Sequence, residues 1–144
     1  MTASLLRNSG EEVGNDMKVL IVEDEGIIAW DLESMVLDNG FEVAGLARTE
    51  IEALSLARRA DIALVDVQLA DGPTGPQIAR TLIDLYGIEV VFMTGNPEIV
   101  AGFEGAVGVV TKPHHLDKVK SALMDALAAR TRKRDARSSG ATAA

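Results

Sequence analysis

The sequence contains no cysteine, which excludes disulfide bonds, thiolate metal sites and thiol nucleophiles. Aromatic residues make up only 3% of the chain, so alanine, valine, leucine and isoleucine must supply most of the core. No apolar run approaches the roughly 18 to 20 residues that a membrane-spanning helix needs, and the first ten residues lack the hydrophobic stretch of a secretory signal. We therefore expect a cytoplasmic protein without a membrane anchor.

Positive charge is scarce except near the end of the chain. The formal net charge is −8, and five of the fourteen basic residues fall within residues 130–137, namely Arg130, Arg132, Lys133, Arg134 and Arg137. The remaining 9 basic and 21 acidic side chains leave the body of the chain near −12. Such a body disfavours binding to nucleic acid, which requires lysine and arginine against phosphates. The basic stretch is expected to be solvated or, less often, to bind a partner or nucleic acid.

A chain of 144 residues suits a single domain. Residues 1–16 are small, polar and acidic, and residues 132–144 are rich in arginine, serine and alanine, so both are expected to be flexible tails. The folded domain is therefore predicted to cover residues 17–131.

Short, continuous apolar runs predict the strands. They are Val19 to Val22, Ile62 to Val65, Val90 to Met93 and Val107 to Val110, with a weaker candidate from Phe41 to Ala47. Continuous runs indicate strands that are buried on both faces of a sheet, as in parallel sheets covered by helices.

Segments with helical periodicity separate these runs. The apolar positions are Ile28, Leu32, Met35 and Val36, then Ile78, Leu82, Leu85 and Tyr86, then Leu116, Val119, Leu123 and Leu127. Residues typical of helix ends agree, including Thr49 with Glu52, Pro76 and Gly87. The alternation predicts a doubly wound α/β fold, (βα)₅, with a five-stranded parallel sheet in the flavodoxin-like order 2-1-3-4-5.

Polar residues follow four of the predicted strands, at the edge where ligands bind in such sheets. Glu23 and Asp24 follow the first strand, and Asp66, Thr94 and Lys112 follow the third, fourth and fifth. Any one of them could simply cap a helix or end a strand. Three carboxylates, a hydroxyl and an amine on one edge instead favour a functional site.

The carboxylates predict a bound cation. Converging carboxylates repel one another unless a cation lies between them, and oxygen ligands without sulfur or imidazole favour Mg²⁺ or Ca²⁺. Because the sequence has no calcium-binding EF-hand loop, we favour Mg²⁺. Beside such an ion, an aspartate can attack a phosphorus atom while the lysine and the hydroxyl stabilise the phosphoryl oxygens.

The chain resembles the receiver domains of two-component response regulators over about residues 17–129. The resemblance rests on Val19-Leu20-Ile21-Val22-Glu23-Asp24-Glu25, Ala63-Leu64-Val65-Asp66-Val67, Met93-Thr94-Gly95 and Thr111-Lys112-Pro113. It implies that Asp66 is the phosphoacceptor and that Glu23, Asp24, Asp66 and the backbone carbonyl of Gln68 hold the metal. It also implies that Thr94 and Lys112 contact the phosphoryl group and that the Lys112–Pro113 peptide is cis.

The resemblance further implies a stand-alone response regulator. Such a protein accepts a phosphoryl group from a histidine kinase or a histidine phosphotransfer protein, and it signals through protein–protein contacts without an attached output domain. It is not an enzyme beyond slow self-phosphorylation and self-dephosphorylation, it has no DNA-binding domain, and a homodimer is possible. The downstream partner is left open.

Two other functions are weighed against this interpretation. A receiver-like module could bind partners without phosphorylation. Alternatively, the chain could be a Mg²⁺-dependent phosphohydrolase with an aspartyl-phosphate intermediate. The hydrolase needs a second acid to activate water, and Val67-Gln68 after Asp66 does not supply the Asp-x-Asp pattern of one such class.

Two departures from the family pattern bear on how the signal is transmitted. Val109 stands where many receivers carry a tyrosine or phenylalanine. Only seventeen residues separate Thr94 from Lys112, and they include Pro97, Gly102, Gly105 and Gly108, so the fourth helix is expected to be short or distorted. Neither His114 nor His115 is expected to bind a metal, and Trp30 is expected to pack on the first helix or lie at the surface.

Overall fold

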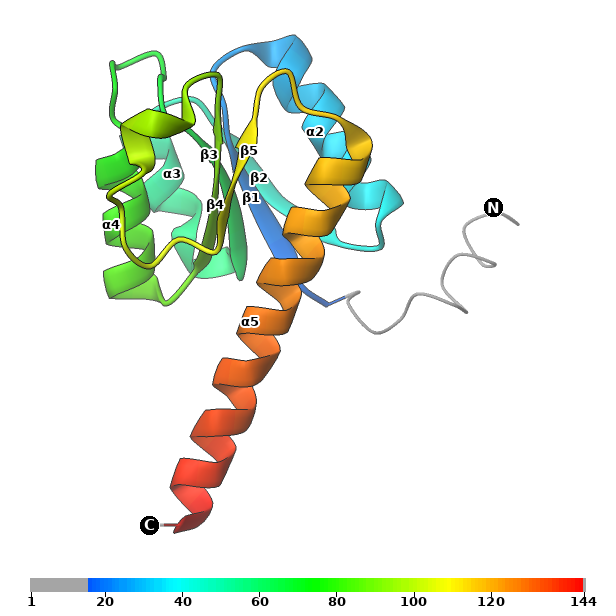
Figure 1. Cartoon of the computed structure of the whole chain (residues 1–144), viewed down its shortest axis with the longest axis vertical. Helices are drawn as coiled ribbons and strands as arrows, with labels where there is room; N and C mark the ends of the chain where they lie inside the picture. Colours follow the sequence, from blue (N-terminus) through cyan, green and yellow to red (C-terminus); the bar gives the residue numbers. More distant parts are fainter. Residues whose placement is uncertain (1–15, 144) are drawn as a thin grey trace.

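The computed structural model describes residues 16–143, and the side chains of residues 16–137. Its sheet has five parallel strands in the order β2-β1-β3-β4-β5 (Figure 1). The strands are β1 (Lys18–Val22), β2 (Glu42–Ala47), β3 (Ile62–Asp66), β4 (Glu89–Thr94) and β5 (Gly108–Thr111). The helices are α2 (Gly26–Asp38), α3 (Glu50–Leu56) with the short 3-10 helix η2 (Ala57–Arg59), α4 (Gly75–Tyr86), the 3-10 helix η3 (Pro97–Val100) and α5 (Leu116–Ala143). This confirms the predicted doubly wound fold and strand order.

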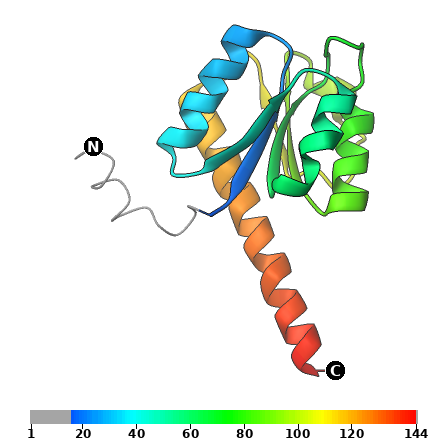
Figure 2. The ribbon, with the colours of Figure 1, turned by 180° about the vertical axis from the view of Figure 1, so that it is seen from behind.

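The sheet lies between two helical layers, with α2 and α5 on one face and α3 and α4 on the other (Figures 1 and 2). Successive strand residues therefore face opposite layers. In β3, Ile62 and Leu64 pack toward α2 and α5, whereas Ala63 and Val65 pack toward α3 and α4. All four are buried, which explains why the strands are continuous apolar runs.

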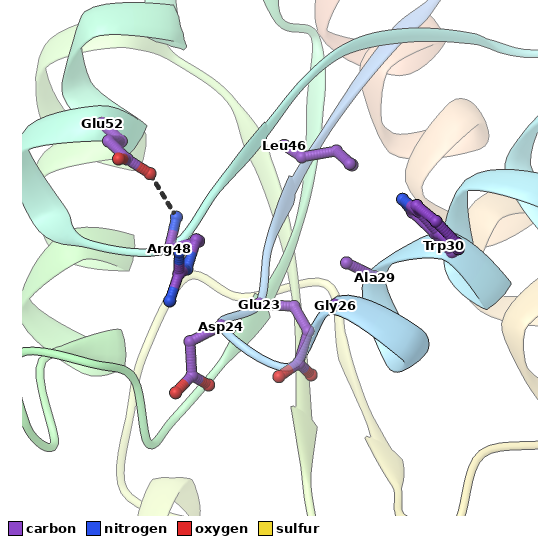
Figure 3. A pocket seen from close by; sticks show the side chains of 8 residues that line it. All are labelled: Glu23, Asp24, Gly26, Ala29, Trp30, Leu46, Arg48 and Glu52. Carbon is purple, nitrogen blue, oxygen red and sulfur yellow. Dashed lines mark hydrogen bonds between the residues drawn. The ribbon is translucent and has the colours of Figure 1, made fainter.

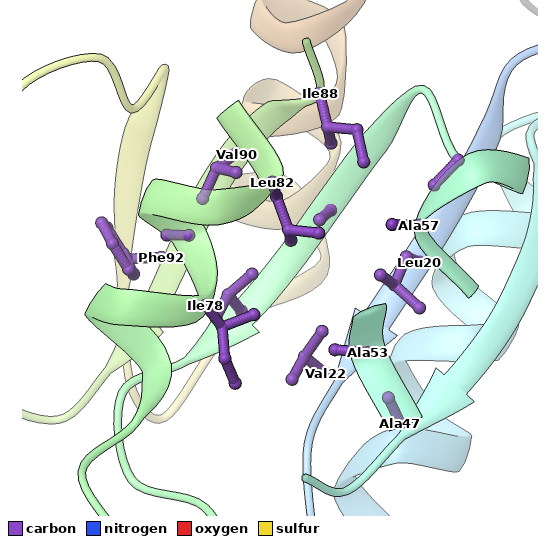
Figure 4. Packing of buried hydrophobic residues seen from close by; sticks show 14 of the residues in the cluster. Leu20, Val22, Ala47, Ala53, Ala57, Ile78, Leu82, Ile88, Val90 and Phe92 are labelled. Carbon is purple, nitrogen blue, oxygen red and sulfur yellow. The ribbon is translucent and has the colours of Figure 1, made fainter. Parts of the chain in front are cut away.

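The layer formed by α3 and α4 combines small and large side chains. Figure 4 shows Ile78 and Leu82 of α4 beside Phe92 of β4, and Ala53 of α3 close to the sheet. Complete burial of a side chain such as Leu82 contributes about 1.5 to 3 kcal/mol. The alanines let α3 approach β1 and β2 closely, whereas the bulky side chains of this layer gather under α4.

The predicted helix ends are largely confirmed. The Thr49 hydroxyl accepts the Glu52 N–H at 3.3 Å at the start of α3, and Pro76 lies in the first turn of α4. Gly87 ends α4 with φ +65°, a conformation that favours glycine. The Glu52 carboxylate differs from a reciprocal capping box because it accepts the N–H of Arg48, at 2.8 Å, rather than that of Thr49.

The fourth helix is reduced to the four residues of η3, as the sequence predicts. The chain that follows η3 is held by Arg80 of α4. The Arg80 guanidinium donates to the Glu104 carbonyl at 2.9 Å and lies 4.8 Å from the ring centre of Phe103. It also forms an ion pair with Asp84. Phe103 in turn packs edge-on against Phe92, with ring centres 4.9 Å apart. A cation and an aromatic contact thus hold this segment where a full helix is missing.

Helix α5 differs from the expected flexible tail after residue 131, because the structure continues it to Ala143. Periodicity of apolar residues ends near Leu127, so the extension carries no core-facing signal in the sequence. Polar contacts made by Arg130 and Lys133, beyond the apolar face, hold the helix against the domain.

Residues 1–15 of the expected N-terminal tail lie outside the described residues. Within the described chain, no helix is both long enough and apolar enough to span a membrane.

Candidate functional site

The five polar residues predicted to share one edge come together at the carboxyl end of the sheet. Asp66 and Thr94 end β3 and β4, and the backbone ladder continues one residue past β1 and β5. There the Glu23 N–H donates to the Ala47 carbonyl at 2.8 Å, and the Lys112 N–H donates to the Thr94 carbonyl at 2.8 Å. These main-chain bonds fix where each side chain starts.

Three of these residues form an acidic cluster. Glu23, Asp24 and Asp66 each offer a carboxylate oxygen, and these oxygens all lie within 4.8 Å of one another. Glu23 and Asp66 are buried, at 2% and 6% exposure, whereas Asp24 is partly exposed. Two carboxylates therefore form the floor of the site and the third lies toward solvent.

Lys112 supplies the opposite charge. Its ammonium donates to Asp66 Oδ2 at 2.8 Å and to Glu23 Oε1 at 3.2 Å. One amine faces three carboxylates, so the site keeps an excess of negative charge. Buried charges require partners, and the excess creates a place for a cation.

The pKa values of the site reflect its burial and the charges that face one another there. Burial raises the pKa of Glu23 from 4.5 to about 7; the Glu25 N–H and Lys112 oppose the rise, and the charge of Asp66 adds to it. Burial alone would lower the pKa of Lys112, but its hydrogen bond to Asp66 and the charges of Asp66 and Glu23 raise it instead. Lys112 is therefore charged at neutral pH, and Glu23 is poised between its two forms.

The residues present fit a hard divalent cation. Three carboxylate oxygens at this spacing, without sulfur or imidazole, are typical ligands of Mg²⁺ or Ca²⁺. A cation here would stabilise the ionised form of Glu23, whose pKa is raised by burial and, to a smaller extent, by the charge of Asp66. The cluster could thus hold the predicted metal, and Asp24 leaves it open toward solvent.

Thr94 lies at the edge of this cluster and is 4% exposed. Its hydroxyl oxygen accepts the Asn96 N–H at 3.0 Å, and its O–H is 3.3 Å from the Asn96 carbonyl oxygen. The hydroxyl therefore belongs to the turn that begins η3. A group that drew this hydroxyl toward Asp66 would compete with that turn.

The main chain after Asp66 is closely packed against the start of α4. A β-carbon added to Gly75 would lie 2.6 Å from the Val67 α-carbon and closer still to the Asp66 carbonyl oxygen. Gly75 also donates its N–H to the Val67 carbonyl at 3.1 Å. This close approach gives Gly75 a role in placing Asp66.

Replacing Gly75 by alanine is expected to destabilise the domain by about 1 to 3 kcal/mol, because backbone rather than a flexible side chain must move. Urea denaturation measures the change. Gly102→Ala is a matched control, because a β-carbon there meets nothing within 4 Å. Equal stability of the two variants would contradict the close packing at Gly75.

A pocket adjoins the acidic cluster between the starts of α2 and α3 (Figure 3). Its lining comprises Glu23, Asp24, Gly26, Ala29, Trp30, Leu46, Arg48 and Glu52. Trp30 is 70% exposed, in agreement with a surface position. Arg48 is not among the residues predicted from the sequence, where its only signal is a basic residue directly after a strand.

The remaining predicted residues are placed as follows. The Gln68 N–H points back to Asp66 Oδ1 at 3.4 Å, and the role of its carbonyl as a metal ligand remains a prediction. The Lys112–Pro113 peptide is cis. His114 lies 3.4 Å from Asp31 and outside the acidic cluster. Val109 is 43% exposed on β5, so no aromatic side chain fills that position.

Comparison with known families and proteins agrees with this geometry. Residues 19–124 match the family described as the response regulator receiver domain. The phyllosphere-induced regulator PhyR of Methylorubrum extorquens is 40% identical over 99 residues, which cover 65% of this chain and 37% of that protein. The transcriptional regulatory protein PdtaR of Mycobacterium tuberculosis is 39% identical over 111 residues, covering 74% of this chain and 54% of that protein. The chain thus spans about half or less of these relatives.

Solved structures give the same result. The response regulator PhyR from Brucella abortus superposes with a TM-score of 0.78 at 35% identity, covering 94% of this chain and 58% of that one. The receiver domain of PhyR from Erythrobacter litoralis superposes with a TM-score of 0.73 at 31% identity, covering 81% and 92%. With the fold, the acidic cluster and the family match in agreement, the chain belongs to the response regulator receiver domain family.

Proposed function

We propose that the protein accepts a phosphoryl group on Asp66, in a Mg²⁺-dependent reaction, from a histidine kinase or a histidine phosphotransfer protein. One observation carries the proposal: Asp66 lies within an acidic cluster with Glu23 and Asp24, and the ammonium of Lys112 is 2.8 Å from its Oδ2. The proposed metal ligands, the proposed nucleophile and a cation suited to phosphoryl oxygens therefore lie together at one edge of the sheet.

In the proposed transfer, an Asp66 carboxylate oxygen attacks the phosphorus of a phosphohistidine. An O–P bond forms and the P–N bond breaks, while the imidazole, already protonated on its other nitrogen, leaves as a neutral ring with the electron pair. Lys112 then exchanges its bond with Asp66 Oδ2 for one with a phosphoryl oxygen. Thr94 donates its hydroxyl to another phosphoryl oxygen. Both contacts stabilise charge that the transfer concentrates near Asp66.

The acidic cluster would hold the metal. When bound, Mg²⁺ would supply positive charge that neutralises the carboxylate and phosphoryl oxygens. Glu23, Asp24, Asp66 and the Gln68 carbonyl are the proposed ligands, with Asp24 the most accessible from solvent. These residues orient the nucleophile and reduce its repulsion for an anionic donor.

The proposed signal is a shift between two conformations of the chain near Thr94. A phosphoryl group favours the conformation in which the Thr94 hydroxyl leaves the Asn96 N–H, and it acts only through that difference in contacts. Because position 109 of β5 carries valine, no aromatic side chain at that position moves together with the Thr94 hydroxyl. We infer that the signal passes to a separate protein through contacts near η3.

Two observations favour a second candidate, a receiver-like module that binds partners without phosphorylation. They are the reduced fourth helix and the exposed Val109. The intact acidic cluster argues against this candidate. A phosphohydrolase has less support, because Val67 is buried and apolar and is followed by Gln68 rather than by a second acid.

Intact-mass analysis after incubation with acetyl phosphate and Mg²⁺ tests the proposal. We expect one phosphoryl adduct, and its loss when EDTA removes the metal. An unmodified chain under the same conditions would favour the phosphorylation-independent module. Rapid turnover of a generic phosphatase substrate would favour the hydrolase.

A further inference from the structure

The basic stretch near the end of the chain lies on α5, where the helix extends beyond the sheet (Figure 1). Residues 130–137 carry five basic side chains and one acidic side chain, Asp135. The proposed phosphoryl transfer uses none of them, because they lie toward the amino end of the sheet, opposite Asp66.

Two of the five basic side chains hold the helix in place. Arg130 donates to the Gly87 carbonyl at 2.7 Å and to Asp61 Oδ1 at 3.1 Å. The Lys133 ammonium is 2.9 Å from Glu89 Oε2, and Glu89 is only 3% exposed. These contacts determine the direction in which α5 leaves the domain, so the residues that follow are presented on an anchored helix.

The other three, Arg132, Arg134 and Arg137, are exposed. They form no ion pair among the residues whose side chains the structure describes. Arg134 and Arg137 share one face of the helix with the two anchors, at i, i+3, i+4 and i+7. These four side chains line a hollow at the helix surface. Since Asp61 and Glu89 balance only the anchors, the hollow keeps an excess of positive charge.

The composition of this segment indicates the class of partner. Residues 128–137 read AARTRKRDAR, with no aromatic or large aliphatic side chain. Protein interfaces depend on buried apolar or aromatic anchors, and helices that lie in a membrane surface need an apolar face. Arginine and small side chains instead suit close approach to phosphates, which the guanidinium binds through paired hydrogen bonds.

The acidic body opposes a polyanion, but distance weakens its effect. Arg137 is seven residues beyond Arg130, which corresponds to about 10 Å along the helix. The Arg137 guanidinium nevertheless reaches back toward the domain, 4.0 Å from where a β-carbon on Gly87 would lie. With a Debye length of about 10 Å at 0.1 M, salt therefore screens the more distant carboxylates of the body rather than its whole field. Binding is therefore expected to be modest and confined to the extended end of α5.

From this charge pattern we propose that residues 130–137 of α5 bind the phosphate backbone of nucleic acid without reading its sequence. Arg134 and Arg137 make the phosphate contacts, and Arg130 and Lys133 hold the helix in position. The interaction is separate from phosphorylation and adds a binding surface to a fold whose body repels nucleic acid.

Fluorescence anisotropy of a labelled 20-base-pair DNA duplex, at several salt concentrations, tests the proposal on the full chain. The variant R134Q/R137Q removes two cations and leaves both anchors. We expect about a tenfold or greater loss of affinity at low salt, and a salt slope reduced by about 2. The matched control R58Q/R59Q removes the same charge from exposed residues of η2 and is expected to bind as the wild type does.

Equal affinity of R134Q/R137Q and R58Q/R59Q would overturn the proposal, because net charge rather than the helix would then govern binding. Tighter binding of poly-glutamate or of phosphatidylglycerol vesicles than of DNA would also overturn it, in favour of an acidic protein or a membrane surface. Single-stranded RNA of equal length is expected to bind through the same arginines. Asp66→Asn is expected to leave nucleic-acid binding unchanged. A failure of the phosphoacceptor proposal can therefore be told apart from a failure of this one.

Discussion

Replacing Asp66 by asparagine is expected to abolish the phosphoryl adduct completely. The amide has nearly the same size as the carboxylate, but it lacks the anionic oxygen that attacks phosphorus. Lys112 keeps its second bond, to Glu23 Oε1, so the side chains around position 66 retain a charged partner. Intact mass after incubation with acetyl phosphate and Mg²⁺ measures the result.

The matched control for this variant is Asp38→Asn. Asp38 is an exposed aspartate at the last position of α2, outside the acidic cluster. It is expected to form the adduct as the wild type does. Peptide mapping that found undiminished phosphorylation in Asp66→Asn would assign the phosphoacceptor to another residue and remove the central proposal.

The second large effect expected is a pH-dependent stability that Mg²⁺ removes. Burial raises the folded-state pKa of Glu23 from 4.5 to about 7, so between these values the folded chain binds more protons than the unfolded chain. Stability without metal therefore falls as the pH rises through that window. At 1.36 kcal/mol per pKa unit, the loss is about 3 kcal/mol. A divalent cation stabilises the ionised carboxylates and reverses it.

Urea denaturation at pH 5 and pH 7.5, with EDTA or with Mg²⁺, measures this effect. Glu23→Gln cannot ionise, so in EDTA we expect it to lose this part of the pH dependence and to be more stable than the wild type at pH 7.5. Glu42→Gln, an exposed residue at the start of β2, is the control and should follow the wild type. A wild-type profile identical to that of Glu23→Gln would show that Glu23 ionises as freely when folded as when unfolded.

The site depends on a balance of negative and positive charge, which requires both its carboxylates and its lysine. Without Lys112, two buried carboxylates would face one another unpaired, and removal of one partner of a buried ion pair costs roughly 3 to 5 kcal/mol. With Lys112 present but no metal bound, the cluster still carries more negative than positive charge. The same shortage that destabilises the metal-free domain therefore provides the driving force for binding a cation.

The local sequence was sufficient to predict most of the fold and which polar residues lie at the carboxyl edge of the sheet. The burial of β1, β3 and β4 on both faces follows from their continuous apolar runs, because such segments are stable only under two helical layers. Parallel strands bring their carboxyl ends to one edge, and so Glu23, Asp66 and Lys112 could be grouped from their positions after the apolar runs. The short η3 likewise followed from its proline and the nearby glycines.

Features that depend on contacts between distant residues could not be found in this way. The extension of α5 lacks an apolar stripe, and its anchors are ion pairs to Asp61 and Glu89, 69 and 44 positions away in the chain. The requirement for Gly75 beside Asp66 has the same character, because it depends on how closely α4 approaches the end of β3.

Element order, strand burial and the identity of the polar residues at the carboxyl edge are thus contained in the amino-acid sequence, because periodicity and strand ends are local properties. The folded chain adds that one ammonium faces three carboxylates, that Glu23 is buried enough to hold its proton near neutral pH, and that Arg134 and Arg137 lie on an anchored helix. Those properties arise from burial and from distances between charges, and folding alone brings the groups together.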